Sequence, residues 1–105
     1  MSFLRRFEIL LPTRFNDGTR IPRRSFEETA EELRERFGAL SKETQTIRGE
    51  WEYGGVIFRD EVMRIFVDAP RTPASREFFI GYKEGLKVRF RQIDMWITAF
   101  EIEMI

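Results

Sequence analysis

The chain has 105 residues, of which 42% are hydrophobic and 34% charged, and its 18 Lys and Arg residues balance 18 Asp and Glu residues. It contains no Cys and no His, which excludes disulfides, thiol nucleophiles, imidazole bases and imidazole ligands for zinc or haem. Zero net charge also argues against non-specific binding of nucleic acid, which requires a basic excess. These counts favour a single domain, 1–105, that holds neither a metal ion nor a cofactor.

The sequence also predicts the cellular compartment of the protein. Its first residues lack the apolar run and the small-residue cleavage site of a signal peptide. No stretch approaches the roughly 18 apolar residues of a membrane span. With no Cys, we expect a cytoplasmic protein without a membrane partner.

The charge is arranged in blocks. Residues 1–24 and 70–91 are basic, whereas 25–37 and 92–105 are acidic. Blocks of opposite sign suit self-association or a charged protein partner.

Alternating apolar residues predict a first strand over Arg6–Leu11, which Pro12 ends. A loop follows, with a turn signal at Asn16–Gly18. A helix is then expected from an N-cap at Ser25 to a C-cap at Gly38. Its start resembles a capping box, in which the side chains of residues 25 and 28 satisfy backbone N–H groups.

Two further strands, Thr44–Tyr53 and Val56–Asp68, are predicted to form a hairpin around a Gly-Gly turn. The charged cluster Arg59–Glu61 interrupts the apolar pattern of the second of them and predicts a bulge or an edge overhang. Trp51 shares a face with Ile47, and we expect it in the core.

A second helix is predicted from an N-cap at Thr72, with Pro73 in its first position, to about Phe90. Gly81 and Gly85 cost the helix about 1 kcal/mol each in propensity. Their spacing of one turn predicts a close packing contact against the sheet or the first helix.

A last strand over Asp94–Met104 completes the order β-α-β-β-α-β. This order resembles the ferredoxin-like, or split β-α-β, superfold. The resemblance implies an α+β domain with a four-stranded antiparallel sheet in the order 4-1-3-2 and two helices on one face. Dimeric α+β-barrel proteins are similar and pack two such sheets face to face.

The period of two along each strand assigns side chains to the two faces of this sheet. The helix-facing set is predicted to be Phe7, Ile9, Leu11, Met63, Ile65, Val67, Met95 and Ile97. The opposite face is predicted to be an interface or ligand face and holds Glu8, Arg48, Glu50, Arg64, Phe66, Trp96 and Phe100. Exposed aromatic residues beside Arg are typical of interfaces.

No catalytic motif is found. Gly55–Arg59 resembles an acylphosphatase phosphate loop, but it lies in the hairpin instead of after the first strand. The third predicted strand offers one aromatic residue, Phe66, and three acids, which does not suit RNA. Asp60 and Glu61 supply too few oxygens for a divalent cation. We therefore assign no catalytic residue and favour a role other than catalysis.

Three functions stay open: a homodimer joined through the open sheet face, a small-molecule-binding or cofactor-independent enzymatic pocket on that face, and an accessory subunit docking on another protein. Arg48 and Arg64 discriminate, because a ligand pocket would leave at least one of them unpaired. The chain also resembles a small uncharacterised bacterial family in Arg14–Gly18, Thr44–Trp51 and the strand end at Asp68. That resemblance implies a bacterial origin and no activity.

Overall fold

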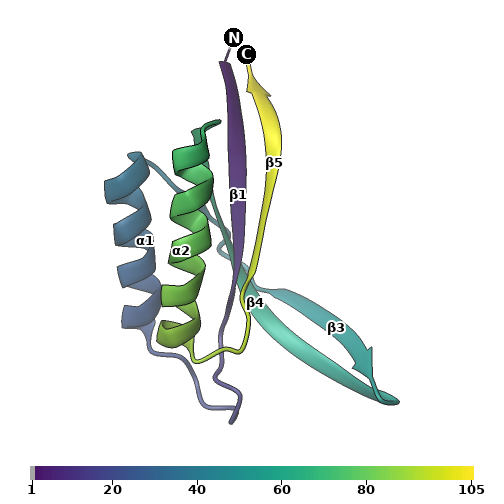
Figure 1. Ribbon diagram of the computed structural model, residues 1–105. Coiled ribbons are helices and arrows are strands. Elements are labelled where there is room, and N and C mark those ends of the chain that lie inside the picture. The colour runs from purple at the N-terminus through teal and green to yellow at the C-terminus, as the bar shows by residue number, and fades with distance from the viewer. Residues whose placement is uncertain (1) are drawn as a thin grey trace.

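The computed structural model describes residues 2–105 and shows an α+β protein with two helices and one five-stranded antiparallel sheet (Figure 1). The elements in chain order are β1 (Ser2–Pro12), α1 (Arg23–Phe37), β2 (Ser41–Lys42), β3 (Ile47–Tyr53), β4 (Val56–Pro70), α2 (Pro73–Phe90) and β5 (Trp96–Met104). The strands are hydrogen-bonded in the order β2-β4-β1-β5, and β3 pairs with β4. Within this part of the chain, neither helix combines the length and the apolarity that crossing a membrane requires.

The sheet has five strands where four were expected. The predicted strand Thr44–Tyr53 is replaced by β2 and β3, which both pair with β4 at different points along it. The chain leaves the sheet between them, over residues 43–46. These four residues are all polar, so the segment has no apolar side chain to hold against the helices.

The two helices lie side by side on one face of the sheet, and the core lies between these layers (Figure 1). Most of the predicted helix-facing set is buried, and Met63 and Ile97 are partly buried. The helices add Leu33, Phe79, Leu86 and Phe90. Phe7 of β1 stacks on Phe79 of α2 with ring centroids 4.1 Å apart, so the central strand and the second helix share one aromatic contact.

Helix α1 begins earlier than predicted, and the capping box at Ser25 is wrong. Pro22 occupies the N-cap position and its side chain makes no capping hydrogen bond. The Ser25 N–H donates to the Pro22 carbonyl (3.0 Å) inside the first turn. Proline sets φ close to its helical value, so it can start a helix without a side-chain cap. The C-cap is as predicted: Gly38 has φ 85° and donates its N–H to the Arg34 carbonyl.

Helix α2 has the predicted cap, with Thr72 Oγ1 accepting from the Ser75 N–H (3.3 Å) and Pro73 in the first position. The predicted packing role of Gly81 and Gly85 is wrong. A Cβ added at either position would meet no atom within 4 Å. Both glycines therefore lie on the outer surface of α2 and are not required there by any contact in the chain.

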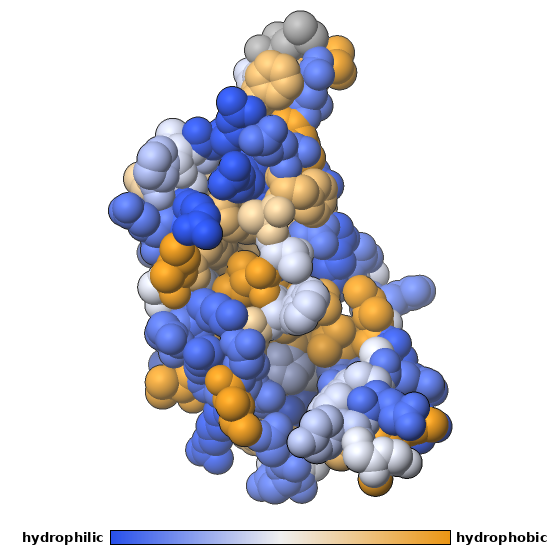
Figure 2. All heavy atoms as spheres, turned by 45° about the vertical axis from the view of Figure 1, so that its right-hand side comes forward, coloured by the Kyte–Doolittle hydropathy of each residue, from blue (hydrophilic) through white to orange (hydrophobic). Residues whose placement is uncertain are grey.

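Strands β3 and β4 extend past the helices as a two-stranded arm, which we define as residues 47–62 (Figure 1). Pairing runs without interruption from Ile47 opposite Val62 to Tyr53 opposite Val56, so the bulge predicted as one alternative at Arg59–Glu61 is absent from this arm. The other alternative, an edge overhang, is what the structure has, because the pairing of β4 with β1 ends at Val62 opposite Pro12. Figure 2 shows the arm tip as a lobe at the lower right, set off from the rest of the molecule by a recess.

Replacing Gly85 by Ala is expected to stabilise the protein by about 0.5–1 kcal/mol, because Ala restricts the unfolded chain and has better helix propensity. The measurement is the midpoint of thermal unfolding. Gly38→Ala is the control and should lower the midpoint, because φ 85° is unfavourable for Ala. A lower midpoint for Gly85→Ala would mean that something packs on this face of α2.

Candidate interaction surface on the sheet

The sheet face turned away from the helices, called here the open face, has a charged centre. Arg64 of β4 donates to the Glu8 carboxylate of β1 and to Glu43 Oε1 at 2.9 Å. One row further along, Arg6 of β1 makes a two-pronged ion pair with Asp68 of β4, at 2.7 and 3.0 Å. The strand pairing brings these residues together, since Arg6 lies opposite Asp68 in the register.

Phe66 lies between the two arginines of this centre. The guanidinium carbons of Arg6 and Arg64 lie 4.3 and 4.7 Å from the ring centroid of Phe66. The hydrogen bond to Glu8 raises the pKa of Arg64, and the hydrogen bond to Asp68 raises the pKa of Arg6. Each cation therefore has both a carboxylate and an aromatic face of its own chain, and neither is left without a partner.

Arg48 and Glu50 do not lie on the open face, so their predicted place there beside Glu8 and Arg64 is wrong. In the register, Arg48 lies opposite Glu61 and Glu50 opposite Arg59, on the same side as the helices. Glu50 pairs with Arg59 at 3.4 Å. The two-residue turn sets Tyr53 opposite Val56, so odd-numbered residues of β3 share the open face with even-numbered residues of β4, which is the reverse of the predicted assignment.

Trp51 is on the open face and is half exposed, so its predicted place in the core is wrong. It stacks on Phe58 across the arm with centroids 4.4 Å apart, and its Nε1–H donates to Asp60 at 2.9 Å. Other apolar residues of the arm share this face and are also exposed: Ile47, Tyr53, Val56 and Phe58. The arm thus has one apolar face that no residue of the described chain covers.

The edge strand β5 adds two exposed aromatic residues to the open face. Trp96 is 66% exposed and Phe100 44% exposed. In the register, Leu10 of β1 lies between Trp96 and Arg64. On the side of the charged centre that faces the arm, the open face is therefore apolar. The role of Trp96 and Phe100 in an interface stays a prediction.

A hollow of about 730 Å³ lies where the arm meets the body of the protein. Trp51, Phe58 and Trp96 line it together with Arg14 and Asp60. Volumes of 300–1,000 Å³ are typical of small-molecule sites. Of the two arginines expected to discriminate, Arg64 is paired and neither lines this hollow.

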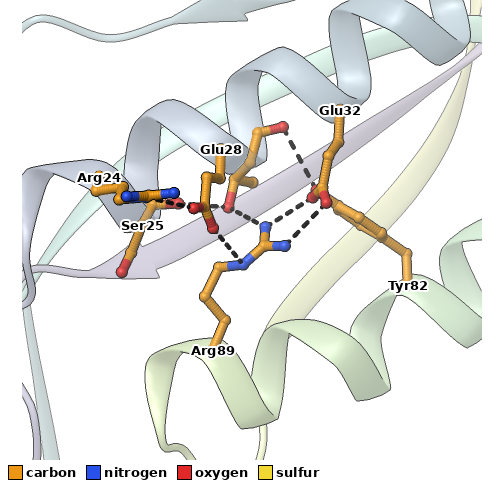
Figure 3. A network of polar contacts seen from close by, with 7 residues as sticks. Arg24, Ser25, Glu28, Glu32, Tyr82 and Arg89 are labelled. Atoms are coloured by element: carbon orange, nitrogen blue, oxygen red, sulfur yellow. Dashed lines mark hydrogen bonds and ion pairs between the residues drawn. The ribbon is translucent and has the colours of Figure 1, made fainter.

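A second polar cluster joins the two helices (Figure 3). Arg89 of α2 donates to both carboxylate oxygens of Glu32 in α1, at 2.7 and 2.9 Å, and to Thr29 Oγ1 at 2.9 Å. Tyr82 donates to the same Glu32 carboxylate at 2.8 Å. The hydrogen bond from Arg89 lowers the pKa of Glu32, and burial raises the pKa of Tyr82. Every group in this cluster has a partner, so it holds the helices together and offers no free reactive group.

Among residues 2–105, no three Asp or Glu side chains gather in a way that could hold a metal ion. Two parts of the surface were missed by sequence reasoning. Glu43 belongs to the charged centre but lies just outside the predicted strand Thr44–Tyr53, and the apolar arm was treated as part of the covered sheet. One signal was available: a two-residue turn at Gly54-Gly55 makes Trp51 and Phe58 direct neighbours.

Glu32→Gln is expected to lower the free energy of unfolding by about 1 kcal/mol near neutral pH, since it weakens a partly exposed charge-assisted pair. Because the folded-state pKa of Glu32 is lowered, its contribution is present above the unfolded pKa and disappears as the pH falls through the folded one. The difference between variant and parent should therefore shrink as the pH is lowered from neutral to below the ordinary pKa of Glu. Urea unfolding over this pH range measures it.

The matched control is Glu31→Gln, which removes an exposed carboxylate from the same helix. It should change stability by less than about 0.5 kcal/mol. Equal effects of the two substitutions would contradict the role assigned to Glu32.

The protein belongs by its fold to the class of small α+β proteins in which two helices pack on an antiparallel sheet. A phage SAM lyase in complex with S-methyl-5'-thioadenosine matches with a TM-score of 0.64 and 12% identity, over 96% of this chain and 90% of that chain. The divalent cation tolerance protein CutA1 from Thermus thermophilus matches with a TM-score of 0.64 and 15% identity, over 98% and 86%. The phage SAM lyase in its apo state matches with a TM-score of 0.55 and 20% identity, over 95% and 80%.

These likenesses concern the fold alone, because the identities are low. No protein-family model matches the sequence, and no curated protein matches it either.

Proposed function

We propose that this protein is an interaction module that forms a homodimer, using the apolar face of the arm and the adjoining part of the open face. The observation that carries this proposal is the apolar face of the arm, which the chain itself leaves uncovered. An exposed and contiguous apolar surface of this kind marks an interaction site.

The arm also needs support that its own chain does not provide. A two-stranded hairpin is marginally stable in water, and a third strand or a covering element is normally required. The part of β4 paired with β3 has no helix against it (Figure 1). A second copy would supply the missing layer and bury Trp51, Tyr53 and Phe58 at the same time.

The state of Arg64 favours the homodimer over a ligand pocket at the charged centre. Arg64 is paired with Glu8 and Glu43 within one chain. Arg48 makes no ion pair, but it lies on the other side of the sheet and does not line the hollow, so neither arginine is available for an anion at the charged centre. The charged centre then acts as a polar border, and the apolar contacts lie beside it.

The proposal includes a ferredoxin-like arrangement of the chain as one domain of a cytoplasmic bacterial protein. The order β5-β1-β4 followed by β2 and β3 supports this arrangement, because it corresponds to 4-1-3-2 if β2 and β3 are counted as one interrupted strand. The absence of Cys agrees with a reducing compartment.

Trp51→Ala and Trp96→Ala are each expected to weaken self-association by about tenfold or more, as buried Trp anchors do at interfaces. Sedimentation at micromolar concentration measures this. The control is Val88→Ala, which removes an exposed apolar side chain from the outer face of α2 and should leave association unchanged. A parent protein that is monomeric at this concentration would overturn the proposal and favour an accessory subunit that docks on a different protein.

A second candidate function is binding of a small molecule in the hollow between the arm and the sheet, with or without catalysis. It is favoured by the two Trp residues that line the hollow and by the likeness to a structure bound to S-methyl-5'-thioadenosine. An aromatic base would stack on indole rings.

This second function predicts a saturable change in Trp fluorescence when S-methyl-5'-thioadenosine is titrated into the protein. The change should weaken in Trp96→Leu, which removes one stacking surface. No change up to about millimolar ligand, which corresponds to about −4 kcal/mol of binding, would reject it for this ligand.

A further inference from the structure

Among residues 2–105, β2, β3 and β5 each pair on one side only, and so does β4 over residues 56–60; the two longest of these edges are β5 and β3. β5 pairs only with β1, and β3 pairs only with β4. β5 is nine residues long and β3 seven. Proteins usually protect such edges with Lys, Pro or bulges, because an open edge pairs with other strands. Neither strand contains Lys or Pro, and neither ladder contains a bulge.

The two edges divide their side chains in the same way. On the open face, β3 presents Ile47, Gly49, Trp51 and Tyr53, and β5 presents Trp96, Thr98, Phe100, Ile102 and Met104. On the other face, the charged residues are Arg48, Glu50 and Glu52 in β3, and Glu101 and Glu103 in β5. A joint sheet that keeps its apolar face continuous must therefore place odd-numbered residues of β3 opposite even-numbered residues of β5.

This condition leaves four registers in which all seven residues of β3 find a partner within β5, two parallel and two antiparallel. Both parallel registers place Glu opposite Glu. The antiparallel register with Arg48 opposite Glu103 does so as well, at Glu50 and Glu101. Like charges directly opposite each other are destabilising.

The remaining antiparallel register places Arg48 opposite Glu101 and has no like-charge pair. It also brings Tyr53 opposite Trp96 and Ile47 opposite Ile102, which are favourable cross-strand pairs. Gly49 comes opposite Phe100, an arrangement in which the aromatic ring covers the glycine backbone. Arg48 makes no ion pair within the described chain, whereas Glu101 already pairs with Arg5 and Arg71, so the contact would give Arg48 a carboxylate that two other arginines share.

We propose that β3 of one copy pairs antiparallel with β5 of a second copy, with Arg48 opposite Glu101, so that the two sheets become continuous. This inference rests on the proposed self-association and specifies its geometry. Because β3 and β5 lie on opposite edges of one sheet, a single contact leaves one edge of each kind free. The homodimer requires a second, reciprocal contact between the same two copies, which joins their sheets along both edges.

Because the chain has no Cys, the pairing is tested by introducing Arg48→Cys and Glu101→Cys together. Within one chain the two positions are separated by three strand spacings, about 14 Å, whereas a disulfide requires Cα atoms within about 7 Å. Mild oxidation should therefore give a disulfide between copies, visible as a larger species on a non-reducing gel. Either single substitution should give little of it.

The matched control for register is the pair Arg48→Cys and Glu103→Cys, which joins the strands in the rejected antiparallel register. It should cross-link at least about tenfold more slowly than the pair with Glu101→Cys, since its sulfur atoms would lie two residues out of register. Equal or faster cross-linking of this control would overturn the proposed register.

A second variant tests whether backbone hydrogen bonds from the free edge of β3 join the two copies. In a hairpin closed by a two-residue turn, the residues flanking the turn bond to each other, so Arg48, Glu50 and Glu52 direct backbone groups to the free edge. Glu50→Pro removes one outward N–H and should weaken self-association by about tenfold or more. Glu50→Ala removes the same carboxylate and keeps the N–H, so it should change association by less than about twofold.

The outcomes separate this inference from the proposed function. If the parent protein self-associates but neither Cys pair cross-links and Glu50→Pro has no effect, edge pairing is overturned and self-association stands. If the parent protein is monomeric, both are overturned.

Discussion

The rest of the structure depends on a mismatch of length between β4 and the helices. A strand rises about 3.4 Å per residue and a helix about 1.5 Å. The 15 residues of β4 therefore reach roughly 50 Å, and the 18 residues of α2 about 27 Å. The helices can cover only one half of β4. Ile65, Val67 and Ala69 are buried in the covered half, and the other half becomes the arm.

The open face has a charged centre and an apolar part that lies toward the arm. Its centre is a self-satisfied cluster, in which Arg6 and Arg64 have carboxylate partners and share the ring of Phe66. Burying this cluster against a partner would require removing water from charges that are already paired, which gains little. The apolar groups between the arm and Trp96 carry no such cost. For this reason the proposed contact is assigned to the arm and to the edges of the sheet, not to the charged centre.

Local patterns predicted most of the secondary structure. The Thr72 cap with Pro73, the Gly38 cap and the Gly-Gly turn depend on short stretches of sequence, and the structure has all three. Alternation identified the buried residues of β1 and β4 for the same reason, because a period of two is a property of one strand. The capping box at Ser25 was wrong because Pro22, three residues earlier, was already able to start the helix.

The wrongly predicted positions of side chains in β3 and α2 depend on how these elements pair or pack with their neighbours. The two-residue turn pairs odd-numbered residues of β3 with even-numbered residues of β4, which places Trp51 on the open face and Arg48 and Glu50 on the opposite one. Gly81 and Gly85 were expected to face a neighbour, but the neighbouring elements pack on the opposite side of α2. Neither relation is visible in a single segment, since each depends on where another segment lies.

The sequence by itself determined the two helices, the alternating strands and the absence of Cys and His chemistry, because composition and local periodicity are read directly from the chain. Only the tertiary structure decided which half of β4 the helices cover, which carboxylates pair with Arg64, to which side of the sheet the apolar face of β3 turns, and which edges stay open. These depend on how far a helix layer extends over a longer strand and on the register across strands, and a one-dimensional pattern contains neither.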